Sequence, residues 1–279
     1  MAKELKTRQN DSSINKIENF GFYNKMMALV SVLPHSKQGN LHYVRKNNNF
    51  SLEVEFSSLR GEAYGTIPRL ILLYLMEYVA IHKQQEIPLG RSVYAFMKSI
   101  GVSITTNRKH ELIRQMKALF SATIRLVQNE DNKKWGFDRQ ANFLIADTID
   151  FFWEKADNEE QDGLFESKVA LSKSFFRELM VSKLVYDKNI LIKIKNNSMA
   201  IDIYLFLQYR VYVLNTSKQK NACIKWEQLS RQFGHSYARQ KDFKRKFKEV
   251  FSDVCELVPS ISFEFDKNGL ELRRTTLVK

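Results

Sequence analysis

Basic side chains recur at helical spacing in two segments of this 279-residue sequence, and the chemistry of such side chains is the binding of phosphate. At about 100° per residue, each of two matching sets falls on one side of a helix. The two sets, 131 positions apart, are His110, Arg114 and Lys117, and Lys241, Arg245 and Lys248. Lysine and arginine neutralise phosphates, and arginine also reads guanine edges in a major groove. The repeat therefore predicts two helices that contact double-stranded DNA.

Neighbouring cations complete the candidate interface. The residues that we predict to contact DNA are Arg108, Lys109, His110, Arg114, Lys117, Arg239, Lys241, Lys244, Arg245, Lys248, Arg273 and Arg274. Six basic residues lie between Arg239 and Lys248, which favours DNA over the usual alternative of a solvated charged face. The first helix is less basic and has Glu111 on its flank, so dimerisation is an equal alternative for it.

The bulk composition agrees with a polyanionic partner. The formal net charge is +13, which attracts nucleic acid first and an acidic membrane surface second. Cys223 and Cys255 are isolated, so neither a zinc site nor a disulfide framework is expected. The longest apolar run, near residues 70–81, contains Glu77 and is too short to span a bilayer, and the first residues form no apolar leader. We expect a cytoplasmic protein that does not bind a membrane.

The sequence shows no constellation that we would assign to catalysis. It has no P-loop motif for nucleotide hydrolysis, and its five histidines form no His-x-His pair for a metal-dependent nicking site. Tyr74 and Tyr78 have the spacing of a two-tyrosine nucleophile, but they lie on an apolar helix, where packing is the expected role. We therefore expect no enzyme activity, no metal and no cofactor.

The elements that must position the basic residues occur twice in the same order. In the first half we expect a strand at 50–56, a helix from Thr66 to Lys83, a strand at 87–89, helices at 92–100 and 106–120, and strands at 122–128 and 134–145. In the second half we expect a strand at 167–171, a helix capped by Ser172, a helix at 198–214, a strand at 222–224, helices at 226–233 and 237–257, and strands at 260–265 and 270–276. Asn268-Gly269 between alternating runs is a strong hairpin signal.

Both basic helices also carry an apolar stripe opposite their cations. The stripes are Leu112, Met116, Leu119 and Phe120, and Phe243, Phe247, Val250 and Phe251. Helix, strand, helix, helix and hairpin follow each other as in a winged helix. The predicted fold is α+β and mainly helical, with two tandem winged-helix domains related by an internal pseudo-repeat. The predicted divisions are a flexible tail at 1–20, domains at 21–153 and 167–279, and an acidic linker at 154–166.

The sequence resembles the RepA-type plasmid replication initiators over roughly residues 45–275. The matching segments are Ile67-Pro68-Arg69-Leu70, Leu89-Gly90-Arg91-Ser92 with Phe96, Arg114-Gln115-Met116 with Leu119-Phe120, Leu171-Ser172, Phe175-Phe176, Ser198, Ala200-x-Asp202-x-Tyr204, Tyr209-Arg210, Trp226, Leu229, Gln232-Phe233-Gly234, Phe243, Phe247 and Gly269-Leu270. One departure is the turn at 102–107, where the family pattern leads us to expect glycines.

The resemblance implies binding to repeated origin sites (iterons), opening of adjacent DNA and recruitment of host replication proteins such as a helicase or initiator. It also implies dimers that repress the protein's own promoter, association with the plasmid or nucleoid, and dominant base contacts from the second domain. Three alternatives stay open. They are a transcriptional repressor that binds an operator, an origin-acting nuclease or primase, and an assembly adaptor that presents the helices at 66–83 and 198–214.

Overall fold

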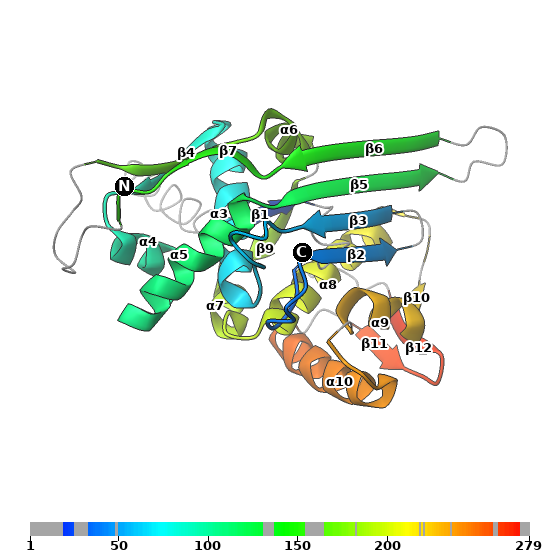
Figure 1. Ribbon diagram of the computed structural model, residues 1–279. Coiled ribbons are helices and arrows are strands. Elements are labelled where there is room, and N and C mark those ends of the chain that lie inside the picture. The colour runs from blue at the N-terminus through cyan, green and yellow to red at the C-terminus, as the bar shows by residue number, and fades with distance from the viewer. Residues whose placement is uncertain are drawn as a thin grey trace, which may run out of the picture.

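The computed structural model describes residues 19–24, 33–47, 50–130, 137–153, 165–181, 183–217, 219, 221–234, 236–258 and 262–273. This part of the chain is a mixed α and β structure with eight helices and four small sheets (Figure 1). The helices are α3 (Thr66–His82), α4 (Val93–Ser99), α5 (Thr106–Phe120), α6 (Lys173–Val181), α7 (Lys188–Ile194), α8 (Ser198–Thr216), α9 (Trp226–Phe233) and α10 (Gln240–Leu257). Most of the predicted tail at 1–20 and linker at 154–166 lies outside the described residues, so both stay predictions.

The strands form sheets that cross the predicted boundary between the halves. They are β1 (Phe20–Asn24), β2 (His42–Asn47), β3 (Phe50–Glu55), β4 (Glu86–Gly90), β5 (Thr123–Glu130), β6 (Phe137–Leu144), β7 (Ala146–Asp150), β8 (Ser167–Leu171), β9 (Lys183–Asp187), β10 (Asn221–Lys225), β11 (Ser262–Phe265) and β12 (Gly269–Arg273). The sheet orders are β1-β9, β2-β3-β5-β6, β4-β8-β7 and β10-β12-β11.

α3 lies at the centre of the first half, as its apolar composition predicts. Ten of its 17 residues are buried. The helix begins at Thr66 as predicted, and its N-cap residue is Gly65, with a φ of 77° and no side-chain cap. The N–H of Gly65 donates to the carbonyl of Pro34 at 3.0 Å, and its own carbonyl accepts from Arg69 at 2.6 Å. The chain therefore enters α3 through a left-handed residue, a conformation that favours glycine.

The ends of the other helices follow local signals in the sequence. Ser172 caps α6 by accepting from the N–H of Phe175 at 3.1 Å, as predicted. α5 spans the predicted residues, and Thr105 caps it by accepting from the N–H of Arg108 at 3.2 Å. The turn before α5 lacks the expected glycines at 102–107, but Gly101 supplies a left-handed residue just ahead of it, with a φ of 75°.

The predicted first hairpin is present but is not a free-standing wing. β5 pairs with β6 from Thr123↔Leu144 to Glu130↔Phe137. On its other side β5 pairs with β3, and β3 pairs with β2, which builds the long four-stranded blade in Figure 1. Arg125 of β5 forms an ion pair with Glu53 of β3 at 2.6 Å. The strand predicted at 50–56 thus pairs with the edge of β5, whose backbone groups a lone hairpin would leave without hydrogen-bond partners.

The two halves exchange strands. β8, which we assigned to the second half, pairs with β4 and with β7 from the first half. β1 near the N-terminus pairs with β9, from Phe20↔Asp187 to Asn24↔Lys183. β1, β2, β7, β9 and α7 were not predicted, because short strands gain their stability from partners that are distant in sequence.

The second half keeps the predicted order from α8 to β12. β12 pairs with β10 on one side and with β11 on the other. In the hairpin turn the Asp266 carboxylate accepts from the N–H of Asn268 at 2.8 Å and of Gly269 at 2.7 Å. A Cβ on Gly269 would lie 1.9 Å from the carbonyl oxygen of Ile224. The predicted hairpin is confirmed, and its glycine is required by a close approach of two backbones.

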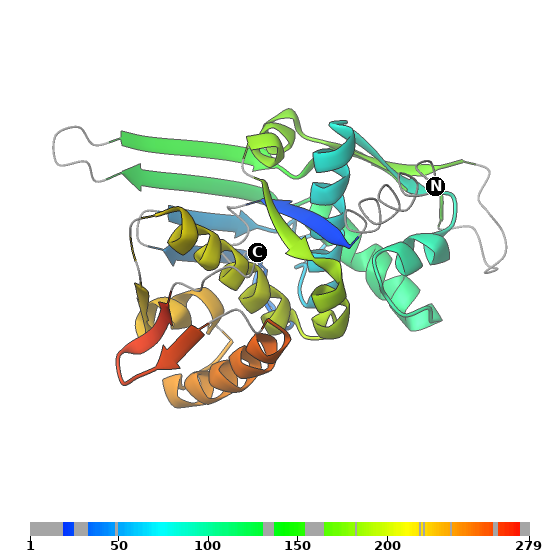
Figure 2. The ribbon, with the colours of Figure 1, turned by 180° about the vertical axis from the view of Figure 1, so that it is seen from behind.

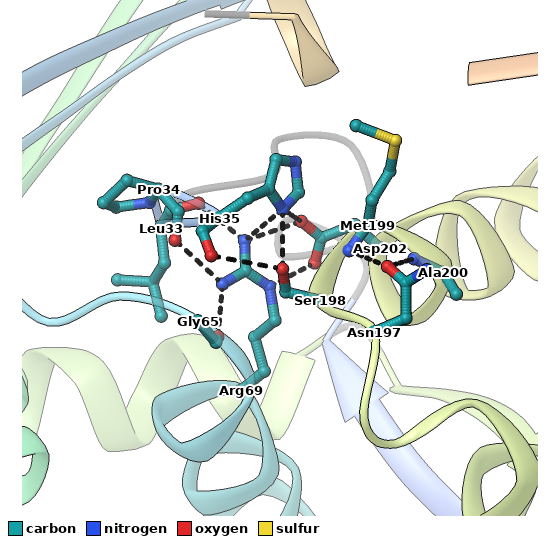
Figure 3. A network of polar contacts seen from close by, with 10 residues as sticks. All are labelled: Leu33, Pro34, His35, Gly65, Arg69, Asn197, Ser198, Met199, Ala200 and Asp202. Carbon is teal, nitrogen blue, oxygen red and sulfur yellow. Dashed lines mark hydrogen bonds and ion pairs between the residues drawn. The ribbon is translucent and has the colours of Figure 1, made fainter. Parts of the chain in front are cut away.

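A buried ion pair joins the halves where two of the resemblance segments meet (Figure 3). Arg69 of α3 donates to both carboxylate oxygens of Asp202 of α8, at 2.8 and 2.7 Å, and also to the carbonyl of Leu33 at 2.6 Å. The ring of His35 contacts Ser198 at 3.2 Å and Asp202 at 3.7 Å. Burial and the nearby Arg69 lower the pKa of His35 to about 3. His35 is therefore neutral here at ordinary pH.

Candidate nucleic-acid interface

The buried side of α10 holds the predicted apolar stripe. Phe243, Phe247, Val250 and Phe251 are each at most 1 % exposed. The ring of Phe247 lies 5.3 Å from that of Phe233 in α9 and 5.6 Å from that of Phe251. This confirms the stripe and fixes which side of α10 faces solvent.

Some cations on the outward side of α10 form ion pairs with carboxylates and others do not. Lys241 and Arg245 are exposed, and within the described residues neither forms an ion pair. Arg239, at the start of the helix, is paired with Asp242 at 2.6 Å. The pair Lys241 and Arg245 therefore offers charge that no neighbouring carboxylate neutralises, one helical turn apart.

Trp226 contacts the other two predicted cations of α10, Lys244 and Lys248. The Nζ atoms of Lys244 and Lys248 lie 5.2 and 5.4 Å from its ring centre, and Lys248 is also 5.4 Å from the ring of Phe265 in β11. The indole N–H donates to the carbonyl of Asp266 at 3.1 Å, so the ring is fixed against the hairpin. Cation–π contacts leave the charge in place and limit where the side chain can point. The role of Trp226 was not predicted, although a tryptophan ahead of a basic helix is a signal for it.

The described hairpin of the second half is not a basic surface. Arg273 forms ion pairs with Glu264 at 2.5 Å and with Glu271 at 3.2 Å. The hydrogen bond that Arg273 donates to Glu271 and the charges of both glutamates raise the pKa of Arg273 above its ordinary value. Arg274, the other predicted contact on this hairpin, lies outside the described residues. The charge of Arg273 is thus already compensated within its own sheet.

The apolar stripe of α5 is buried as predicted, but Lys109 lies on the wrong side for a groove contact. Leu112, Met116 and Leu119 have no exposed surface. Lys109 is only 8 % exposed, and its Nζ lies 5.5 Å from the ring centre of Tyr94 in α4. The prediction that Lys109 contacts DNA therefore needs correction, because its side chain points toward α4 rather than into solvent.

Arg114 is held within its own helix. It donates to Glu111 at 3.0 and 2.8 Å, and its guanidinium lies 4.9 Å from the ring centre of Tyr64. The hydrogen bond from Arg114 also lowers the pKa of Glu111, which keeps this carboxylate charged. Of the other predicted residues, Arg108 and His110 are exposed and Lys117 is half-buried. α5 therefore offers less uncompensated charge than α10.

The two tyrosines with nucleophile-like spacing are engaged in packing. The hydroxyl of Tyr74 donates to the carbonyl of Pro88 at 2.9 Å, and that of Tyr78 donates to Gln84 at 2.9 Å. Burial raises the pKa of Tyr74 to about 12. In the part of the chain that the structure describes, no helix is both long and apolar enough to cross a bilayer.

Two crystal structures of domains 2 and 3 of RctB share the fold. The first has a TM-score of 0.58 at 10 % identity and covers 91 % of this chain and 99 % of the other. The second has a TM-score of 0.52 at 9 % identity and covers 90 % of this chain and 97 % of the other. At such low identity the likeness concerns the fold alone. No curated protein matches the sequence.

A protein family matches the sequence directly. The family described as "Plasmid encoded RepA protein" matches residues 62–228, from the segment before α3 to the first turn of α9. The match covers more than half of the chain and includes both Arg69 and Asp202 of the buried ion pair. α10 and the last hairpin lie beyond the matched residues, so their assignment rests on the structure. This chain belongs to the family of plasmid-encoded RepA proteins, the plasmid replication initiators.

Proposed function

We propose that this protein initiates plasmid replication by binding repeated origin sites in double-stranded DNA through two tandem winged helices. The observation that carries the proposal is α10, whose one side is buried on phenylalanines while Lys241 and Arg245 project without a carboxylate partner among the described residues. A major groove admits such a helix. The order helix, strand, helix, helix and hairpin in both halves supports the winged-helix assignment.

The two helices have unequal roles in this proposal. α10 supplies most base contacts, with Arg245 nearest to the centre of its outward side and Lys244 and Lys248 placed by Trp226 for phosphates. α5 contributes weaker contacts through Arg108 and His110, which are exposed. In Figure 1 α5 lies at the left and α10 at the bottom right, with α7 between them in this view, and Figure 2 shows the same order from behind. Two modest affinities on one chain combine through a high effective concentration.

Initiation adds further steps to binding. The bound protein opens adjacent DNA and recruits a host helicase or initiator, and a second copy forms the dimer that represses the promoter. The protein itself is not an enzyme in this proposal, and it needs no cofactor or metal. Its location follows from that of the plasmid, in the cytoplasm.

Footprinting of the purified protein on DNA around its own gene tests the proposal. We expect protection of several regularly spaced repeats. Arg245→Ala should weaken binding by about 1–3 kcal/mol and relax the preference at one base pair. The matched control is Lys246→Ala on the same helix, because Lys246 is already paired with Glu249 at 2.6 Å. If Arg245→Ala leaves both affinity and preference unchanged, Arg245 does not read a base.

A transcriptional repressor with the same fold is the second candidate. The +13 charge and α10 fit either function equally. Protection of a single palindrome over the promoter, with no replication from a cloned origin, would favour the repressor. Binding no tighter than to random DNA would exclude both.

A further inference from the structure

One face of α3 lines a hollow at the surface: Leu70 and Leu73 at its start are buried, and Ile81 near the end of the helix is exposed. Leu70, Leu73, Tyr74, Tyr78 and Ile81 recur at helical spacing along this face. They line a hollow of about 670 Å³ that α4 and α7 close on its other sides. At 1.5 Å per residue, the stripe from Leu70 to Ile81 is about 17 Å long. The hollow is therefore an elongated groove the length of about three helical turns.

Large apolar side chains at the edges of the groove are exposed. Ile81 of α3 is 53 % exposed and Ile192 of α7 is 59 % exposed. Both line the groove, together with the half-buried Leu191. Exposed apolar residues of two helices that line one apolar hollow are typical of a surface that receives the apolar face of another helix.

The charges around the groove select the kind of partner. Lys98 of α4 and Lys195, which follows α7, line it, and within the described residues neither forms an ion pair. The one carboxylate among the lining residues is Glu77, which is already paired with Lys188 at 2.5 Å. The rim is therefore positive around an apolar floor. A DNA backbone would satisfy the lysines but would leave the apolar floor unfilled.

We propose that this groove binds an amphipathic helix of a partner protein, with large apolar side chains on one face and carboxylates beside them. The inference rests on the proposed function, because an initiator must recruit other replication proteins, and it assigns a surface to that step. The partner helix lies along α3, places its apolar side chains between Ile81 and Ile192, and pairs its carboxylates with Lys98 and Lys195.

The test uses the full chain and two synthetic helical peptides of about 14 residues, which is long enough to span the stripe. One peptide has leucines at helical spacing flanked by glutamates, and its twin has lysines in place of the glutamates. Fluorescence anisotropy should show the glutamate peptide binding at least about tenfold more tightly. Ile192→Ser should weaken its binding by at least about tenfold, and the double variant Lys98→Glu/Lys195→Glu should reverse the preference between the peptides.

Matched variants control for general effects. Leu59→Ser changes an apolar residue that is 91 % exposed and lies outside the groove, and Lys193→Glu reverses an exposed charge on α7 that does not line it. Neither should alter peptide binding. Equal affinity for the two peptides, or equal loss in the control variants, would overturn the proposal.

Two parallel measurements separate this proposal from rival occupants and from the proposed function. If Ile192→Ser dissociates a dimer in sedimentation, or if Lys98→Glu/Lys195→Glu weakens origin binding at constant peptide affinity, the groove serves self-association or DNA and the proposal is wrong. If the native chain prefers the glutamate peptide but does not bind origin DNA, the proposed function fails while the groove assignment stands.

Discussion

At the scale of single residues, the partner of each cation decides what it can do. Arg245 and Arg114 lie 131 positions apart on the two predicted basic helices, but Arg114 is bonded to Glu111 and contacts Tyr64, whereas Arg245 is exposed. Lys109 is buried against Tyr94. A charged side chain that is already paired gains less from a phosphate than a free one, because binding must first break the pair.

His35 gives a pH-dependent prediction at the same scale. Its pKa is about 3 in the folded protein and about 6.5 in an unfolded chain, so the unfolded state takes up the proton first. The contribution of neutral His35 is therefore full above about pH 6.5 and is lost as the pH falls, at roughly 1 kcal/mol per pH unit. Urea unfolding at several pH values should show a shallower pH dependence for His35→Gln. His110→Gln, at an exposed site, should keep the native slope. Parallel curves for His35→Gln and the native chain would contradict the assignment.

At the scale of elements, the two hairpins differ in how they are supported. β5 and β6 join a four-stranded sheet, whereas β11 and β12 extend only to β10. The shorter sheet carries Phe265, which stacks on Trp226 with ring centres 5.6 Å apart. The last hairpin therefore has a direct effect on α10, since the same tryptophan places Lys244 and Lys248.

Gly269→Ala tests that link. The added Cβ would lie 1.9 Å from the carbonyl of Ile224, so β10 and β12 must separate. We expect a loss of about 1–3 kcal/mol in the free energy of unfolding, as for an overpacked site. We also expect weaker origin binding, because Trp226 shifts with the hairpin. Thermal unfolding and anisotropy measure the two effects. Lys267→Ala, in the exposed turn beside it, should leave stability within about 0.5 kcal/mol of the native value.

At the scale of the whole molecule, the chain folds as interleaved halves. The β4–β8 and β1–β9 pairs and the Arg69–Asp202 ion pair all connect residues on opposite sides of the predicted linker. These connections hold α5 and α10, the two helices that we propose to bind DNA, at a set separation. We therefore expect the two halves to unfold in one cooperative transition.

Asp202→Ala tests the junction. It leaves Arg69, which is 5 % exposed, without its carboxylate partner, and breaking a buried pair from one side costs about 3–5 kcal/mol. Arg273→Ala removes an ion pair at the surface and should cost much less, because solvent screens an exposed pair. Denaturant unfolding compares the two variants. An equal cost for both would show that the Arg69–Asp202 pair contributes no more than a surface contact.

Patterns local to the sequence could be predicted well. The periods of α5 and α10 give their buried stripes, Ser172 gives a cap, and Asp266 to Gly269 give a turn, because each depends on residues within a few positions of one another. The motifs of the family could also be recognised, in their order along the sequence, and the family match confirms the resemblance. The two apolar stripes predicted 131 positions apart are both buried.

The sequence alone determined that the chain is basic, that it has two amphipathic basic helices, and that its motifs follow the same order as in the RepA family. Only the tertiary structure decided which cations are already paired, since Glu111, Asp242 and Glu264 bind them through contacts that periodicity does not encode. It also decided which strands pair between the halves and which face of α3 lines a hollow. The physical reason is that burial and charge pairing depend on neighbours brought together by the fold, whereas helix and turn signals act over a few residues.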